Sequence, residues 1–175
     1  MTYGFALLHA DRLAQERERK ERNKLPKAFV KVTGDRLNEP LFHDWLATLT
    51  KTHKVIVCVG GGTQINEEFD ARGLPVKKHP LLGRDTDTEG LRVAHTVLKN
   101  NKARLCAALR ARGAKADILL PIVYMADELC HVDADLMVLN AYWGFETLYV
   151  VTTPERVAQK REQFSSLPKV HILSF

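Results

Sequence analysis

The chain has 175 residues, of which 45% are hydrophobic and 27% are charged, and its formal net charge is +5. This length predicts a single folded domain whose core needs no disulfide bonds for support. Aromatic residues make up 7% of the chain and do not alternate with basic residues, which argues against a nucleic-acid partner. The modest positive charge instead suits a small anionic substrate.

The three cysteines, Cys58, Cys106 and Cys130, show no paired spacing and lie in or beside apolar segments. Such cysteines are typical of buried free thiols in an intracellular protein. No apolar run approaches the length that spans a bilayer, and the first residues lack the pattern of a signal peptide. We therefore expect a cytoplasmic protein with no membrane partner.

Residues 1–25 form the first unit that the sequence predicts, a charged N-terminal helix. Residues 4–24 are rich in Ala, Leu, Glu, Arg and Lys, and Pro26 ends the pattern. From Gln15 onward the segment is charged on all sides, so it either projects into solvent or packs against another subunit. A homo-oligomer is the expected assembly.

Residues 26–175 form the second unit, in which strands and helices alternate. The expected helices cover residues 39–52, 63–72, 86–112, 133–143 and 153–164. The expected strands cover 27–32, 55–59, 118–120, 146–151 and 170–173, and Pro121 limits the third of them. We expect a loop over 74–85, irregular chain or one helical turn over 124–130, and a break in the long helix near Asn100 and Asn101. This order predicts an α/β fold, a three-layer αβα sandwich with a mostly parallel sheet.

A buried strand, residues 55–59, runs directly into Gly60, Gly61 and Gly62, with Thr63 as the expected N-cap of the next helix. Open α/β sheets bind ligands at such strand ends, where backbone N–H groups and a helix N-terminus attract anions. The stretch predicts either a phosphate cradle or a tight turn without a ligand, and by itself favours neither.

Two common phosphate-binding motifs do not fit this stretch. A dinucleotide fingerprint needs a third glycine, and Ile65 occupies that position. A Walker loop needs Gly-Lys-Ser/Thr, whereas Gly62 is followed by Thr63 and Gln64. An αβα oxidoreductase that uses a dinucleotide is therefore the weakest of the functions we consider.

The segment from His131 to Asp135 concentrates polar groups, with Asp133 between them. One interpretation is a metal site, and the other is a helix N-terminus whose carboxylates face the helix dipole. With three potential ligands we expect no dedicated metal site, although Mg²⁺ that arrives with a nucleotide needs only one or two carboxylates.

Taken together, the motifs resemble the amino acid kinase family, which includes acetylglutamate kinase, aspartokinase, glutamate 5-kinase, carbamate kinase and uridylate kinase. The resemblance begins near residue 27 and runs to the end. Its motifs are Lys31-x-x-Gly34, the triple glycine, Gly83-Arg84-Asp85-Thr86-Asp87, the segment 131–135, and Leu148-Tyr149-Val150-Val151-Thr152-Thr153. It implies the αβα sandwich of that family.

The resemblance also implies a function, an ATP-dependent small-molecule kinase that uses Mg²⁺ and transfers the γ-phosphoryl group to a carboxylate, carbamate or phosphate. Phosphoryl transfer depends on positioning and on stabilisation of charge by cations and amides. By resemblance, Lys31 would stabilise the transferred group and Asp135 would position that lysine. The expected phosphate-binding residues are Gly34, Gly60, Gly61 and Gly62, and the expected substrate-binding residues are Arg84, His131 and Asp133.

The sequence departs from the family at three points. Thr33 and Asp35 replace a glycine and a serine of the usual first motif, and the chain ends at Phe175, before the region that holds most of the adenine site and a second lysine. Lys160 is the nearest substitute for that lysine, and we do not predict it as one. The alternative is therefore a non-catalytic member that binds a nucleotide or anion as a regulatory or assembly subunit.

Overall fold

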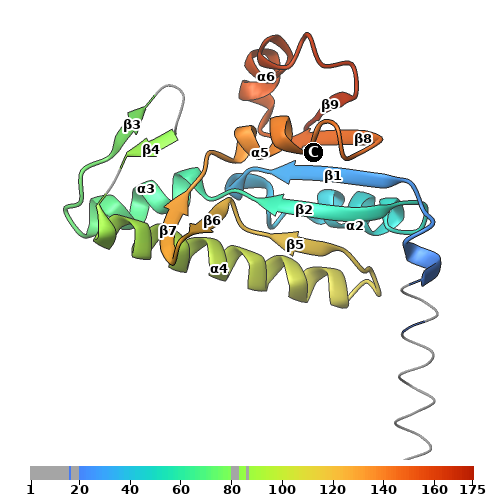
Figure 1. Ribbon diagram of the computed structural model, residues 1–175, viewed down its shortest axis with the longest axis horizontal. Helices are drawn as coiled ribbons and strands as arrows, with labels where there is room; N and C mark the ends of the chain where they lie inside the picture. The colour runs from blue at the N-terminus through green and yellow to red at the C-terminus, as the bar shows by residue number, and fades with distance from the viewer. Residues whose placement is uncertain (1–15, 17–19, 80–82, 86) are drawn as a thin grey trace, which may run out of the picture.

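The computed structural model describes residues 16, 20–79, 83–85 and 87–175. Its centre is a five-stranded parallel sheet in the order β5-β2-β1-β8-β9 (Figure 1). The strands are β1 (Lys27–Val32), β2 (Lys54–Val59), β5 (Asp117–Leu119), β8 (Thr147–Val151) and β9 (Val170–Leu173). The predicted α/β class with a mostly parallel sheet is confirmed, and the predicted bounds of β1 and β9 agree with the structure.

Helices cover both faces of the sheet because its central strands are apolar on both sides. On one face, Val30 of β1 and Val57 of β2 pack with side chains of α2 (Pro40–Leu49) and α4 (Thr88–Arg110). On the other face, Phe29 and Cys58 pack with side chains of α5 (Ala134–Ala141) and with Phe164 at the end of α6 (Val157–Gln163). Alternation along β1 therefore directs successive residues into two separate cores.

A third core lies between α3 (Gly62–Ala71) and α4, where Ile65 and Phe69 pack against Val93 and Leu98. The predicted N-cap of α3 was wrong: the cap residue is Gly61, and Thr63 lies inside the first turn. The Thr63 hydroxyl donates instead to Asp35 Oδ2 at 3.0 Å, and among the described residues no side chain caps α3. Asp35 belongs to the short 3₁₀ helix η1 (Gly34–Arg36), which follows β1.

Two hairpins replace segments that the sequence predicted to be irregular. Strands β3 (Lys77–His79) and β4 (Gly83–Asp85) pair antiparallel, as do β6 (Ile122–Met125) and β7 (Glu128–His131). The turn of the second hairpin places Ala126 at φ 46° and Asp127 at φ 71°. Two-residue hairpin turns need such positive φ values and are usually recognised by Asn-Gly or Asp-Gly, so this Ala-Asp turn gave no sequence signal.

Helix α4 continues through Asn100 and Asn101, so the predicted break was wrong. Asn101 is 3% exposed, and its Nδ2 atom donates to the carbonyl oxygen of Gly60 at 3.0 Å. A residue with weak helix propensity is thus used inside the helix because its side chain satisfies a buried carbonyl. At the other end of the chain, the 3₁₀ helix η2 (Pro154–Arg156) precedes α6 where one longer helix was expected.

The predicted N-terminal helix lies for the most part outside the described residues, and of residues 20–25 only 20–22 are helical. Its role in a homo-oligomer stays a prediction. Within the described part of the chain, no helix has both the length and the hydropathy that crossing a bilayer requires.

We expect Phe42→Ala to reduce the free energy of unfolding by about 3–5 kcal/mol, because it removes a fully buried ring from the core under α2. Leu41 is the matched control: it precedes Phe42 in the same helix but is 62% exposed, so Leu41→Ala should change stability by less than about 0.5 kcal/mol. Urea unfolding followed by tryptophan fluorescence measures both values. Equal losses in the two variants would contradict this assignment of the core.

Candidate functional site

A cavity of about 410 Å³ opens where β1 and β2 end and where α3, α5 and α6 come together. This is the carboxyl edge of the parallel sheet, the usual place for a ligand in open α/β folds. Its lining joins segments that are far apart in sequence, including Lys31, Gly34, Gly61, Asp135 and Lys160. Because β1 and β2 are neighbours with Lys31 opposite Cys58, the end of β1 and the glycine loop share one hollow.

Close approach between two backbone segments forms the floor of the cavity. The Gly60 N–H donates to the Val32 carbonyl at 2.7 Å, and a Cβ atom at Gly60 would lie 2.9 Å from that oxygen. A Cβ atom at Gly34 would overlap Gln64 Oε1 and would lie 3.0 Å from Gly61 Cα. Lack of space against fixed backbone therefore requires glycine at Gly60, whereas at Gly34 the Gln64 side chain would have to move and the contact with Gly61 would be tight.

The Asp135 carboxylate lies between two ammonium groups. Lys31 Nζ is 3.0 Å from Asp135 Oδ1, and Lys160 Nζ donates to Asp135 Oδ2. The side chains of these three residues are 8%, 16% and 12% exposed, for Lys31, Asp135 and Lys160 respectively. Gln163 Oε1 accepts a further bond from Lys160 Nζ at 2.7 Å, so the second ammonium is held from two sides.

Burial by itself would raise the pKa of Asp135, but the charge of Lys31 and the hydrogen bond and charge of Lys160 outweigh it and lower the pKa below 3.8. The carboxylate is therefore ionised at neutral pH. The neighbouring Cys58 differs: burial raises the pKa of its thiol to about 12, partly offset by Lys31, so this cysteine is neutral and is not a nucleophile.

Two further carboxylates line the cavity, and each accepts a hydrogen bond from the protein. Asp35 accepts from the Thr63 hydroxyl, and Asp133 caps α5 by accepting from the Asp135 N–H at 2.7 Å. Arg156 adds a cation from η2, and His131 lies at the end of β7. The cavity therefore carries both signs of charge and can bind a ligand that has anionic groups together with hydrogen-bond donors.

The cavity brings together nearly all the residues that the sequence singled out: Lys31, Gly34, Gly60, Gly61, Gly62, His131, Asp133 and Asp135. Their roles stay predictions. Arg84 belongs to β4, and its side chain lies outside the described part of the structure. Lys160 and Arg156 were not predicted, because a lysine on a short charged helix has no sequence feature that marks it as facing a site.

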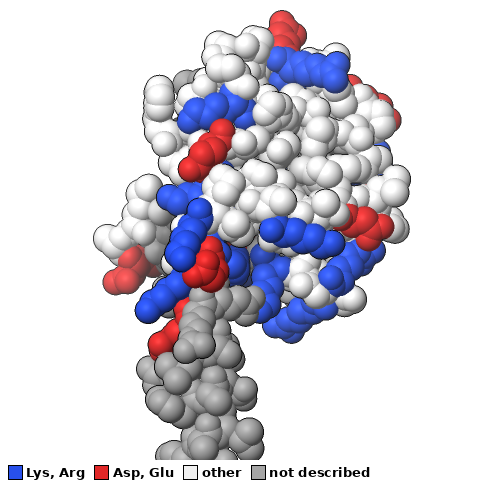
Figure 2. Space-filling model, turned by 90° about the vertical axis from the view of Figure 1, so that its right-hand side faces the viewer, with Lys and Arg blue, Asp and Glu red and all other residues white. Residues whose placement is uncertain are grey.

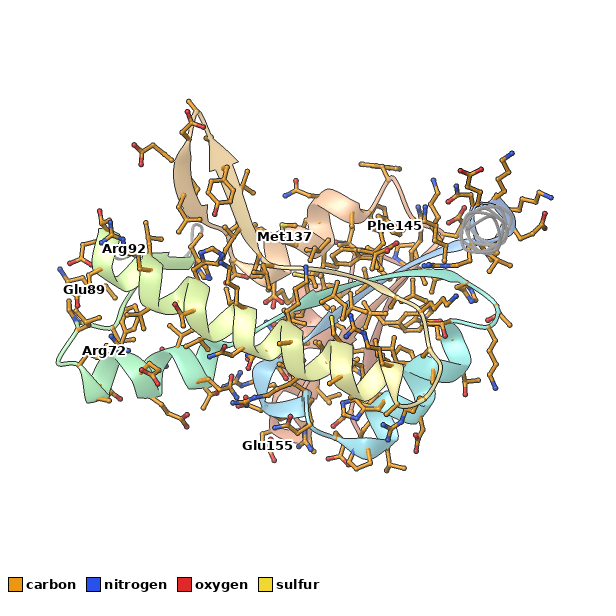
Figure 3. The ribbon with its side chains drawn as sticks, turned by 90° about the horizontal axis from the view of Figure 1, so that it is seen from below. Arg72, Glu89, Arg92, Met137, Phe145 and Glu155 are labelled. Atoms are coloured by element: carbon orange, nitrogen blue, oxygen red, sulfur yellow. The ribbon has the colours of Figure 1, made fainter. Side chains whose placement is uncertain are left out.

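A second hollow of about 420 Å³ lies between α3 and α4, and Arg72, Glu89 and Arg92 gather there at one end of the molecule (Figure 3). Arg72 pairs with Glu68 at 3.3 Å on the helix surface, with half-exposed side chains. Exposed pairs of this kind contribute little to the free energy of folding, and they do not provide the buried polar groups that hold a ligand in place. The carboxyl-edge cavity is therefore the stronger candidate site.

Basic residues also gather at the amino end of the sheet, where Figure 2 shows Lys and Arg side chains with acidic side chains between them. Arg22 lies 3.7 Å from Asp117, and Lys24 lies 2.7 Å from Glu21. The mixed signs make this surface a solvated one rather than a uniform positive patch. In the described residues, no cluster of His, Cys, Asp and Glu with the geometry of a metal site occurs.

No protein-family model and no curated protein matches the sequence. Among solved structures, N-acetylglutamate synthase from Neisseria gonorrhoeae complexed with coenzyme A and L-arginine is similar, with 14% identity, a TM-score of 0.66, and coverage of 89% of this chain and 57% of that chain. The same synthase complexed with coenzyme A and N-acetyl-glutamate has 15% identity and a TM-score of 0.56, covering 85% of this chain and 54% of that chain. The chain thus spans little more than half of the synthase.

The protein smu.665 from Streptococcus mutans UA159 is also similar, with 14% identity and a TM-score of 0.54, covering 79% of this chain and 82% of that chain. At such low identity these likenesses show a shared fold.

These neighbours correct the predicted membership of the amino acid kinase family. The one neighbour whose activity is named is a synthase solved twice with coenzyme A, and none of these three structures is described as a kinase or as bound to ATP. The predicted ATP-dependent kinase, its phosphoryl transfer, and ATP and Mg²⁺ as cofactors were therefore wrong, and so was the alternative, a non-catalytic nucleotide- or anion-binding member of the amino acid kinase family. The physical reason for the error is that a strand-end lysine, a glycine loop and an acidic helix start belong to the carboxyl edge of a parallel sheet and do not specify the reaction.

We expect Asp135→Asn to destabilise the fold by about 3–5 kcal/mol at pH 7, because two largely buried ammonium groups would lose their shared anion. The pKa of Asp135 is lower in the folded state than its ordinary value of 3.8. Its ionised form therefore stabilises the protein fully at pH values above that ordinary pKa, and this contribution is lost as the pH falls through the folded-state pKa. Chemical unfolding at several pH values should show the difference between variant and wild type shrinking below about pH 4. Asp70→Asn, at an exposed position on α3, is the control and should show no such trend. A constant difference down to pH 3 would contradict the ionised trio.

Gly60→Ala and Gly62→Ala form a second matched pair. The first places a methyl group against the Val32 carbonyl and should cost about 1–3 kcal/mol of stability, whereas the second meets nothing within 4 Å and should cost less than about 0.5 kcal/mol. Thermal unfolding measures both. If alanine were tolerated equally well at the two positions, the close approach of β1 to the glycine loop would be wrong.

Proposed function

We propose that this chain binds a small amino-acid-derived carboxylate in the cavity at the carboxyl edge of its sheet. The observation that carries the proposal is the Asp135 carboxylate between Lys31 and Lys160. One carboxylate cannot neutralise two ammonium groups, so the trio keeps a net positive charge inside a partly closed hollow. An anionic ligand group beside the trio would be attracted by this local positive charge at a place where water screens it weakly.

The other lining residues favour a ligand that also donates hydrogen bonds. An ionised carboxylate has about four acceptor sites, so Asp35 and Asp133 have acceptor capacity beyond the bonds from Thr63 and from the Asp135 N–H. A simple inorganic anion would meet repulsion from these two groups. An amino acid or N-acylated amino acid carries a carboxylate as well as an N–H donor. It can therefore bind the ion trio through its carboxylate and Asp35 or Asp133 through its N–H group.

Size and the neighbours' ligands support the same chemical class. A volume of about 410 Å³ lies in the lower part of the range of small-molecule sites and suits a compact metabolite better than a whole coenzyme A. N-acetyl-glutamate and L-arginine, which are named as ligands of the N-acetylglutamate synthase neighbours, are compact molecules of this class.

Acyl transfer from a thioester is the second candidate, favoured by the coenzyme A bound in both structures of the synthase. In that reaction a neutral amine attacks the thioester carbonyl, a C–N bond forms and the C–S bond breaks; the nitrogen loses one proton and the departing thiolate gains one, so the products are an amide and a thiol. Lys31 and Lys160 would stabilise the negative charge that develops on the carbonyl oxygen. Release of coenzyme A thiol from acetyl-CoA in the presence of L-glutamate measures this activity directly.

Isothermal titration with N-acetyl-L-glutamate, L-glutamate and L-arginine tests the binding proposal. We expect at least one of these ligands to bind, and Lys31→Ala or Lys160→Ala to weaken its affinity by about tenfold or more through loss of a charge-assisted contact. Lys51→Ala, which removes an exposed lysine just after α2, is the matched control and should leave affinity within about twofold.

Inorganic pyrophosphate and Mg²⁺-ATP are the comparison ligands. Absence of binding by all three amino-acid-derived compounds would contradict the proposal. So would tighter binding of pyrophosphate or Mg²⁺-ATP, since either result would assign the cavity to phosphate groups.

A further inference from the structure

The buried Asn101 side chain connects α4 to the glycine loop. Its Nδ2 atom donates to the Gly60 carbonyl at 3.0 Å, and the residue is 3% exposed. Leucine is better than asparagine both as a helix former and as a partner for the neighbouring Leu98 and Leu105. An asparagine here therefore stabilises the helix less than leucine, and its distinguishing contact is the one with Gly60.

That contact determines the direction of the peptide group between Gly60 and Gly61. In a trans peptide the C=O and N–H bonds point in opposite directions, and the structure contains no cis peptide among its described residues. Because the Gly60 C=O points at Asn101, the N–H of Gly61 points away from it. Gly60 and Gly61 line the cavity, whereas Asn101 does not.

The preceding peptide group is held as well. The Gly60 N–H donates to the Val32 carbonyl at 2.7 Å, so the loop is fixed to β1 on one side and to α4 on the other. On the α4 side there is little room for a change of conformation, since a Cβ atom at Gly61 would lie 3.1 Å from Leu98 Cδ2 and 3.2 Å from Asn101 Nδ2. The loop thus has one conformation with both of its anchors in place.

We infer that Asn101 is a positioning residue for the site: by holding the Gly60 carbonyl it aims the Gly61 N–H into the cavity, where this amide donates to the anionic group of the ligand. The inference rests on the proposed function for the identity of that ligand. A preorganised amide contributes to binding without the cost of ordering the loop when the ligand arrives. Without Asn101 the carbonyl would be unpaired, and the peptide would rotate to find another donor.

Amide hydrogen exchange of residues 60–63 in the absence of ligand tests the inference independently of the ligand. In Asn101→Leu, which keeps the branched shape and the number of side-chain heavy atoms but removes the donor, we expect exchange at these amides to be about tenfold faster or more. Leu105→Ala lies one turn further along α4 in the core beneath the sheet and is the control for loss of global stability. Asn101→Ala is the second variant if the leucine variant does not fold.

Affinity for the amino-acid-derived ligand found by titration provides the second readout. We expect it to fall by about tenfold in the Asn101 variant and by less than about twofold in Leu105→Ala. The inference is overturned if loop exchange is unchanged, if Leu105→Ala accelerates it equally, or if affinity is the same in the two variants. Should wild type bind no ligand, the proposed function fails while the exchange measurement still decides the role of Asn101.

Discussion

The ion trio of Lys31, Asp135 and Lys160 is the interaction on which the rest of the site depends. Its members come from β1, α5 and α6, which are adjacent only because β8 and β9 place the last third of the chain beside β1. Taking these charged groups out of water costs free energy, and their mutual attraction offsets this cost only if the groups are held at short distances in a defined geometry. The start of α5 contributes as well, since a carboxylate in the first turn of a helix lies in the favourable part of the helix dipole.

The glycine loop adds the second constraint, which concerns shape. In the proposed function, backbone amides near the ammonium groups donate to the ligand, and amides reach a ligand only where no side chain intervenes. The ends of β1 and β2 lie in direct backbone contact, since Gly60 approaches the Val32 carbonyl and Gly34 approaches Gly61. In the proposed function the ion trio and the glycine loop therefore have different roles: the trio supplies charge, and the loop supplies directed hydrogen-bond donors.

The sequence predicted the parts of the fold that depend on local pattern. The bounds of β1 and β9 were predicted correctly, because short apolar runs between clear breaks determine them. The hairpin of β6 and β7 was missed, since its turn uses Ala126 and Asp127 in place of the usual glycine. The helix break at Asn101 was predicted wrongly for a related reason: its partner, Gly60, is 41 residues away in sequence, and propensity carries no information about such contacts.

In the candidate site, too, residues whose positions follow from local pattern were predicted, and a residue whose position depends on distant contacts was not. Lys31, Gly60 and Asp135 could be placed from the sequence because they stand at strand ends or helix starts, and in a parallel sheet those positions converge. Lys160 could not, because its place depends on how α6 packs back toward α5, which only the tertiary contacts determine.

The order of the motifs did not identify the reaction, because the groups that they provide are common to many reactions. A lysine at a strand end, a glycine loop and an acidic helix start provide positive charge, close amides and a positioned carboxylate, and these stabilise an anion whatever the reaction is. What would separate one reaction from another is the shape of the ligand and the group that attacks it, and neither is encoded in the order of the motifs. The function of this cavity therefore has to be identified from the ligand that it binds. The carboxylates of Asp35 and Asp133 beside the positively charged ion trio restrict that ligand to one with both anionic groups and hydrogen-bond donors.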